Sequence, residues 1–264
     1  MRTVVHFQQT VKMIYGHPTL RIDDLRIYEK ECVAFYGLNE DIAEIITNQI
    51  TGTYPPEEGS VFIHGIDSRE IADSTWFDFV GDFGIYSIST PLQENASIGE
   101  NIAMIFRRQD SAMDEARLSA AVLKLANLVH LTITDLSKIM NEATSLLRMK
   151  VRLARALAFR PKVVILREPT EKLSRDVSQK LLDLLKRVRR KWKFTLLLFT
   201  GDIWFLQEAA ARVLFLNPQT GIIVENQLRG WYHNVLPFLK PSPARLLQLS
   251  RDILQYGQTK GSRV

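Results

Sequence analysis

The chain alternates short apolar runs with amphipathic stretches, a pattern typical of a domain in which helices cover a mostly parallel sheet. The apolar runs are too short for helices and are bounded by glycine, proline or polar residues, which favours buried strands. Predicted strands of this kind lie at 32–36, 60–64, 84–89, 163–166, 194–199 and 213–216, and predicted helices lie at 41–52, 180–193 and 203–211.

Two longer segments near the N-terminus, 4–13 and 20–28, alternate apolar and polar residues, which predicts strands with one exposed face. We expect them to form antiparallel edge strands. Residues 97–127 instead carry apolar residues at helical spacing. The predicted fold class is therefore α/β, with a mostly parallel sheet as its core, antiparallel N-terminal edge strands and an inserted helical subdomain.

The same pattern predicts the domain boundaries. The α/β core takes residues 1–95 and 147–227, the helical subdomain takes 96–146, and a C-terminal extension takes 228–264. This extension holds six basic residues and a single acid, whereas the whole chain has a formal net charge of +5. Such a segment either binds an anionic surface, grips a neighbouring subunit or is simply solvated.

Composition excludes several classes of protein. The chain has 264 residues, of which 46% are hydrophobic and 24% charged, and no apolar run approaches the length of about 18 residues that spans a membrane. The N-terminus lacks the apolar block of a signal peptide, so we expect a cytosolic protein. Cys32 is the single cysteine and is predicted to lie in the core. The five histidines show no metal-binding spacing, and no Gly-x-Ser-x-Gly motif supplies a hydrolase nucleophile.

The stretch 151–170 carries the candidate chemistry. A predicted helix ends before Pro161, and the apolar strand 163–166 follows it directly. Residues 167–170, Arg-Glu-Pro-Thr, then lie where this strand ends. Since ligands of open α/β sheets bind outside the carboxyl ends of the strands, we expect functional residues here.

This order of helix, strand and Glu-Pro-Thr resembles the core of the ATP-binding cassette (ABC) ATPases. The resemblance extends from about residue 11 to 225 and implies the fold of that family. Matching segments are Tyr15 at the aromatic position that stacks on adenine, 31–37 at the first strand and glycine, 51–52 and 58–61 at the following turn, 100–102 at the start of the helical subdomain, 154–157, 168–170 and 200–202.

The resemblance also assigns a phosphate loop, which departs from the pattern of the family. The loop begins at Gly37 and includes Asn39, but Ala43 occupies the position of the phosphate-binding lysine and Glu44 that of the hydroxyl that binds Mg²⁺. The acids at 40–41 add further negative charge. Because carboxylates repel a triphosphate, these residues imply weakened nucleotide binding.

The other nucleotide-contacting motifs differ as well. Arg167 replaces the aspartate of the metal site, whereas Glu168 keeps the position of the general base. Gly201 replaces the switch histidine, and Thr144 and Ser145 begin a signature segment that lacks its glycines. Without metal and phosphate a general base has nothing to activate, and Glu168 then has only a structural role.

The resemblance therefore implies a pseudo-ATPase subunit of a membrane transport complex, peripheral on the cytoplasmic face of the membrane. We expect no cofactor of its own, with ATP and Mg²⁺ bound only weakly or at a composite site with a partner. The expected partners are a competent ABC ATPase subunit and transmembrane subunits. We expect no nucleic acid partner, because the basic helix 186–193 is predicted to be a solvated outer face.

Two alternatives remain open. One is a residual ATPase that uses Glu168 with a shifted phosphate contact from Lys12 or Arg148. The other is an interaction module that works without a transporter. Length and the C-terminal extension also resemble the ATPase subunits of lipid-transport systems.

Overall fold

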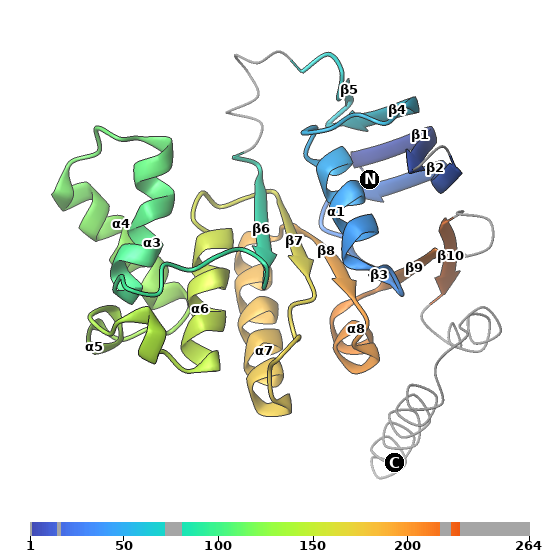
Figure 1. The fold of residues 1–264 in the computed structure, drawn as a ribbon. Helices are drawn as coiled ribbons and strands as arrows, with labels where there is room; N and C mark the ends of the chain where they lie inside the picture. The colour runs from blue at the N-terminus through green and yellow to red at the C-terminus, as the bar shows by residue number, and fades with distance from the viewer. Residues whose placement is uncertain (1, 15–16, 72–80, 217–222, 228–264) are drawn as a thin grey trace, which may run out of the picture.

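The computed structural model describes residues 2–14, 17–71, 81–216 and 223–227. Predictions that fall on Tyr15 and on 228–264 lie outside these residues. The described strands form two sheets (Figure 1). One has six strands in the order β10-β9-β3-β8-β7-β6, and the other has four in the order β2-β1-β4-β5.

The six-stranded sheet is mostly parallel, as predicted. Strands β6, β7, β8, β3 and β9 pair in parallel, and only β10 runs antiparallel, to β9. Because these parallel strands are in register, Ser87, Arg167, Phe199 and Phe35 lie in one row near their carboxyl ends. The strands are β3 (Cys32–Tyr36), β6 (Phe83–Ser87), β7 (Val163–Arg167), β8 (Thr195–Thr200), β9 (Arg212–Leu216) and β10 (Ile223–Gln227).

The predicted N-terminal edge strands form a separate sheet. β1 (Thr3–Ile14) pairs antiparallel with β2 (His17–Tyr28) and with β4 (Glu58–Ile63), and β4 continues into the two-residue strand β5 (Ile66–Asp67). Helix α1 (Glu40–Ile50) shares one apolar core with both sheets. In that core the rings of Phe35 and Phe199 stack with centroids 4.5 Å apart.

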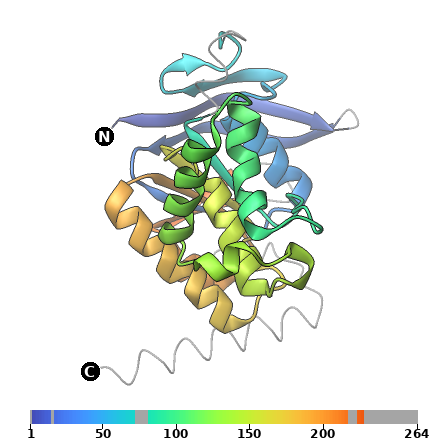
Figure 2. The ribbon, with the colours of Figure 1, turned by 90° about the vertical axis from the view of Figure 1, so that its left-hand side faces the viewer.

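The predicted helical stretch 97–127 forms two helices. The break lies before Asp114, whose carboxylate accepts the N–H of Arg117 at 2.9 Å and so starts a new helix. Figure 2 shows these helices from their own side of the molecule, in front of the strands. The helical region comprises α3 (Ile98–Gln109), α4 (Glu115–Leu128), α5 (Ile133–Leu136), the 3₁₀ turn η1 (Met140–Glu142) and α6 (Ser145–Ala156).

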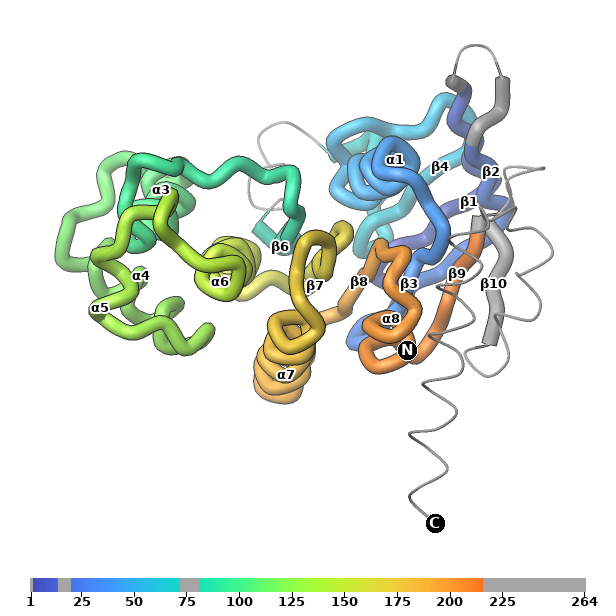
Figure 3. The backbone as a smooth tube through the Cα atoms, turned by 60° about the horizontal axis from the view of Figure 1, so that its bottom comes forward, coloured from blue at the N-terminus to red at the C-terminus, as the bar shows by residue number. Residues whose placement is uncertain are grey.

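Helix α7 (Arg175–Trp192) begins earlier than the predicted position 180, because Ser174 caps it by accepting the N–H of Val177. α8 (Ile203–Ala209) follows β8. Figure 3 shows α3, α4 and α5 at one end of the molecule and the four-stranded sheet toward the other, with β6, β7, β8 and β3 between them. Among the described helices none is long and apolar enough to cross a membrane.

Helix α6 packs on β6 with almost no space between the two backbones. A Cβ atom added to Gly84 of β6 would lie 1.9 Å from the carbonyl oxygen of Ala156. Only glycine permits this approach. The contact places the arginines of α6 beside the carboxyl end of the sheet.

Candidate functional site

The candidate site lies where β3, β7 and β8 end. Gly37 follows β3, Glu168 follows β7, and Gly201 follows β8. Gly37 has φ +77°, a left-handed conformation that favours glycine. The structure therefore brings together the predicted residues of the phosphate loop, the acidic motif and the switch segment.

The loop after Gly37 leads into α1, and its polar groups bind one another. Asn39 is the N-cap of this helix, and its side-chain oxygen accepts the N–H of Ile42 at 2.8 Å. A helix N-terminus normally attracts an anion, but here Glu40 and Asp41 stand in the first turn and supply that negative charge themselves. Ala43 is buried with 4% exposure and faces the core. No cationic side chain replaces the missing lysine on this turn.

Arg167 reaches the same helix from the end of β7. Its guanidinium forms an ion pair with Glu40 and lies 3.8 Å from the carboxylate of Glu44. It also donates to the hydroxyl of Ser89 at 3.3 Å. The Arg167 side chain is only 11% exposed, whereas Glu40 and Glu44 are 45% and 56% exposed. Two partly exposed carboxylates thus surround one nearly buried cation.

Glu168 lies beside this ion pair but bonds in the other direction, to β8. Its carboxylate accepts the backbone N–H of Gly201 at 3.1 Å and the hydroxyl of Thr200 at 3.3 Å. Burial raises the pKa of Glu168 to about 7, although these two hydrogen bonds act to lower it. Its backbone has φ 39° and donates to the carbonyl of Phe199 at 2.8 Å. Glu168 therefore ties the ends of β7 and β8 together.

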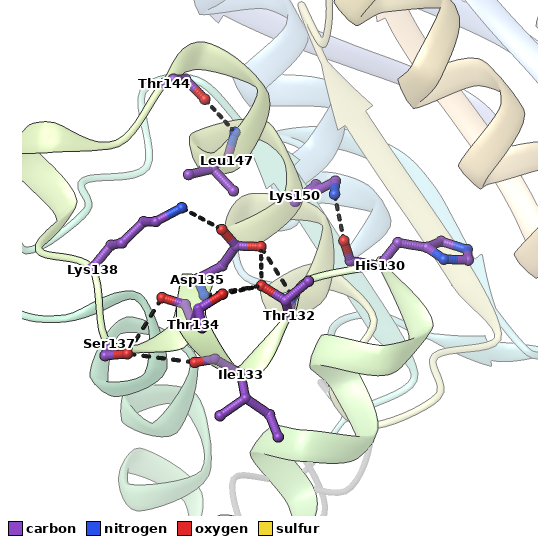
Figure 4. A network of polar contacts seen from close by, with 10 residues as sticks. All are labelled: His130, Thr132, Ile133, Thr134, Asp135, Ser137, Lys138, Thr144, Leu147 and Lys150. Atoms are coloured by element: carbon purple, nitrogen blue, oxygen red, sulfur yellow. Dashed lines mark hydrogen bonds and ion pairs between the residues drawn. The ribbon is translucent and has the colours of Figure 1, made fainter.

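The signature segment lies at the start of α6, and its first residue is used as a helix cap. Thr144 accepts the N–H of Leu147 at 3.4 Å, and Ser145 is the first residue of the helix (Figure 4). The preceding turn is fixed by Asp135, which accepts from Thr132 and from the ammonium of Lys138 at 2.6 Å. The Lys138 contact, ahead of the Thr132 bonds, lowers the pKa of Asp135. The Thr144 hydroxyl thus caps α6 as an acceptor and keeps its O–H for a further hydrogen bond.

Lys12 and Arg148, the two alternative phosphate contacts, both pair with carboxylates of the protein. Arg148 holds Glu94 through two hydrogen bonds of 2.7 and 2.5 Å and donates to the carbonyls of Met140 and Ala143. Lys12 pairs with Glu57 on the four-stranded side of the molecule. Both cations are therefore already paired with carboxylates of the protein.

A protein-family model described as ABC transporter matches residues 20–171, which is more than half of the chain. The chain belongs to the ABC transporter family. Among curated proteins it is 28% identical over 170 residues to the methionine import ATP-binding protein MetN 1 of Burkholderia pseudomallei, which covers 64% of this chain and 48% of that protein. It is 25% identical over 239 residues to MetN of Clostridium acetobutylicum, covering 90% of this chain and 72% of the relative. The chain spans about half the length of the first of these relatives.

Solved ABC cassettes share the fold. The dimeric bacterial ABC transporter cassette MJ0796 aligns with a TM-score of 0.72 at 22% identity, covering 86% of this chain and 99% of that chain. CbiO1 of Clostridium perfringens, part of the ABC transporter complex cbiONQ, aligns with a TM-score of 0.76 at 16% identity, covering 95% and 100%. The predicted ABC-type fold is therefore confirmed.

The ABC family implies ATP and Mg²⁺, but the residues of this cassette do not fit them. A magnesium ion needs oxygen ligands, and the nearly buried Arg167 guanidinium stands at the acidic position instead. Glu40 and Glu44 stand at phosphate-loop positions, and their negative charge repels phosphate. In the described part of the chain no group of three His, Cys, Asp or Glu side chains is arranged to hold a metal ion.

The sequence shows each of these changed residues separately, but it does not show that they contact one another. Arg167 and the acids of α1 were each expected to weaken nucleotide binding, and the structure shows that they bind one another. One signal in the sequence could have indicated this contact, because Arg167 is positively charged and the acids of α1 are negatively charged. Ile42, which replaces the second glycine of the phosphate-loop pattern, was not singled out and lies buried in the core at 5% exposure.

Proposed function

We propose that this ABC chain is a pseudo-ATPase subunit of a membrane transport complex, in which an internal ion pair takes the place of the magnesium nucleotide. The observation that carries the proposal is the contact of Arg167 with Glu40 and Glu44. The subunit then serves as a structural or regulatory partner of a competent ABC ATPase.

Repulsion between the loop carboxylates and a triphosphate supports this proposal more strongly than the loss of the lysine alone. A triphosphate at this site would have to displace the Arg167 pair or approach two carboxylates without the usual lysine. Two like charges about 4 Å apart repel by about 4 kcal/mol near a protein surface. One such contact is equivalent to about a thousandfold in affinity.

The choice of a transport complex rests on the relatives. The MetN relatives are named as methionine import ATP-binding proteins, and one solved neighbour belongs to a transporter complex. We extend only the general role to this chain, namely association with transmembrane subunits on the cytoplasmic face of a membrane. The expected second cassette would offer its own phosphate loop to the start of α6, where Thr144 and Ser145 lie. Slow or absent turnover follows, because this segment lacks the glycines of the signature pattern.

Calorimetric titration with Mg·ATP, up to millimolar nucleotide, tests the proposal on the full chain. We expect no saturable heat. The charge-removed variant Arg167→Ala is the informative comparison, since its loop carboxylates remain and should still exclude ATP. Saturable binding near micromolar concentration by the unmodified chain would refute the pseudo-ATPase assignment.

A residual ATPase is the second candidate, and one observation favours it. Glu168 keeps the general-base position, and its pKa of about 7 suits proton transfer at neutral pH. This candidate requires Mg²⁺-dependent phosphate release that Glu168→Gln abolishes. Lys12 and Arg148 already pair with Glu57 and Glu94, which weighs against this candidate. An interaction module without a transporter would instead copurify with neither a second cassette nor membrane subunits.

A further inference from the structure

A strongly basic surface covers the edge of the six-stranded sheet where its parallel strands begin, opposite the candidate site. Two adjoining grooves lie there, with volumes of about 590 and 490 Å³. Five cations and no acid are among the described residues that line the first groove. These five cations, with two more from the second groove, are called the basic edge below. They are Lys30, Lys186, Arg189, Arg190 and Lys193 of the first groove, and Arg160 and Lys162 of the second.

Three of these cations stand in the turns that lead into neighbouring strands. Lys30 lies two residues before β3, Lys193 two residues before β8, and Arg160 three residues before β7. Their φ angles are 65°, 55° and 53°, in the left-handed region where glycine fits without strain. The chain therefore carries a cation in each of three turns where glycine would be the easier residue. The negative end of α7 accounts for cations in its own last turn, but Lys30 and Arg160 belong to other elements.

The carboxylates of the chain offset only part of this charge. Lys162 and Lys186, at the margins, pair with Asp82 at 2.6 Å and with Glu208 at 3.3 Å. The side chains of the other two lysines and of Arg190 form no ion pair with a described residue. Cations held close together repel one another, and a bound carboxylate would relieve that repulsion.

Arg189 fixes the relative position of two of the turns. Its guanidinium donates to the carbonyl of Lys30, and its Nε donates to that of Phe194 at 3.3 Å. Both acceptors are neutral, so these bonds place the Arg189 cation without cancelling its charge. The turns that carry Lys30 and Lys193 are thereby held next to one another.

The grooves also have apolar surfaces beneath the cations. Leu182, Leu185 and Leu196 line the first groove and are only 1%, 2% and 3% exposed, so they form its floor. In the second groove the half-buried Trp192 lies under the guanidinium of Arg160, 5.3 Å from its ring centroid. A ligand at the basic edge thus meets a cationic rim and an apolar floor, which favours an anion with apolar groups of its own.

We propose that the basic edge binds an acidic, amphipathic helix of a partner protein, which lies across the beginnings of β3, β8 and β7. These three strands are adjacent in the sheet. Neighbouring strands lie about 4.8 Å apart, and successive turns of a helix about 5.4 Å apart. Glutamates one turn apart can therefore each meet the cation of one strand, while leucines beside them cover the apolar floor.

A nucleic acid fits these observations less well. Proteins that bind single strands without sequence preference stack the bases on aromatic side chains. Trp192 already has the Arg160 guanidinium over its ring, and Phe194 is only 2% exposed. The inference also goes beyond the proposed function and does not depend on it, because the basic edge lies at the other edge of the sheet from Arg167 and Glu40.

Fluorescence anisotropy with the full chain tests the proposal. The probe is a labelled helical peptide of about 16 residues with three glutamates one turn apart and leucines beside them. One matched peptide carries glutamine in place of the glutamates, and another carries serine in place of the leucines. We expect the first peptide to bind at least about tenfold more tightly than either matched peptide.

Glycine variants separate binding from stability. Lys30→Gly and Lys193→Gly remove cations at left-handed positions, so the free energy of unfolding should change little. Each should weaken the glutamate peptide about threefold, and the double variant should lose the preference over the glutamine peptide. Lys172→Gly is the matched control, because Lys172 is exposed and has φ 60° but follows β7 at the opposite edge. It should leave peptide binding unchanged.

Several outcomes would overturn the proposal. They are equal affinity for the three peptides, no binding below millimolar concentration, and losses in the Lys172 control equal to those at the basic edge. Single-stranded DNA that competes as strongly as unlabelled peptide would assign the surface to nucleic acid, and phosphatidylglycerol vesicles that do so would assign it to a membrane. Nucleotide is absent from these measurements, so this proposal and the pseudo-ATPase assignment fail independently.

Discussion

The guanidinium of Arg167 binds the carboxylate of Glu40 across 127 positions of sequence, and so joins the end of β7 to the first turn of α1. In a working phosphate site these two places face the same bound ion and nucleotide, and each depends on that ligand for its charge balance. Here both charges belong to the protein. The two changes partly compensate one another, and the ion pair forms without a ligand.

The first prediction concerns the strength of this ion pair. Arg167→Ala should lower the free energy of unfolding by about 1–2 kcal/mol, because it leaves two carboxylates close together without their cation. A double-mutant cycle with Glu40→Gln should give a coupling energy of about 1 kcal/mol in urea unfolding. The exposed pair of Arg117 and Asp114, tested by Arg117→Ala, should cost about 0.5 kcal/mol or less. Coupling no larger than in this surface pair would contradict the role given to Arg167.

The second prediction concerns Glu168 and pH. Its pKa is raised to about 7 in the folded protein, whereas an unfolded glutamate has a pKa of about 4.3. The folded state therefore holds the proton more tightly, and Glu168 lowers the free energy of unfolding as pH rises from about 4.5 to 7.

Glu168→Gln should remove this pH dependence while it keeps an oxygen for the N–H of Gly201. Relative to the unmodified chain, the variant should gain about 1–2 kcal/mol between pH 5 and pH 8, after allowance for solvent screening. Urea unfolding at both pH values measures the difference. Glu142→Gln, at an exposed residue, controls for the loss of one carboxylate. Parallel pH curves for the Glu168 variant and the unmodified chain would show that burial has not raised this pKa.

The third prediction concerns the contact of β6 with α6. Gly84→Ala should cost at least about 3 kcal/mol, since the new methyl group meets a backbone oxygen that has no room to move. Gly65→Ala is the matched control, because its Cβ would meet no atom within 4 Å and only its φ of +87° opposes the change. We expect a cost of about 1 kcal/mol there. Thermal and urea unfolding check both, and equal losses would argue against direct contact of the two backbones.

The fourth prediction concerns Cys32. Its thiol is 3% exposed and donates to the carbonyl of Ala209 at 2.7 Å, and burial raises its pKa to about 11. Since the thiolate is the reactive form, a maleimide at pH 8 should label the folded chain at least about a hundredfold more slowly than the chain in urea. Mass spectrometry follows the modification. Rapid labelling under native conditions would place Cys32 outside the core.

The fold was predictable to the extent that each element has its own local pattern. Strands β3, β7 and β8 are buried on both faces, so their apolar runs could be recognised without knowledge of their neighbours. Helix α7 was predicted too short, because its first turn is polar and only the Ser174 cap marks its start. The two-residue strand β5 carries no pattern of its own and depends on its pairing with β4.

The site was predictable as a set of missing groups but not as a set of contacts. Ala43, Glu44, Arg167 and Gly201 could be assigned by their place in the family pattern. No local pattern indicated that Arg167 pairs with Glu40, since the pairing depends on how the strand ends meet.

The position of β3 in the sheet also bears on how the chain is made. β3 lies between β8 and β9, so its neighbours come from the far end of the sequence. During synthesis this apolar strand stays unpaired until both neighbours have been made. Its edges can meanwhile pair with other chains. Under the proposed function the chain gains no stability from nucleotide, and it then has more need of a chaperone or an early partner at this stage.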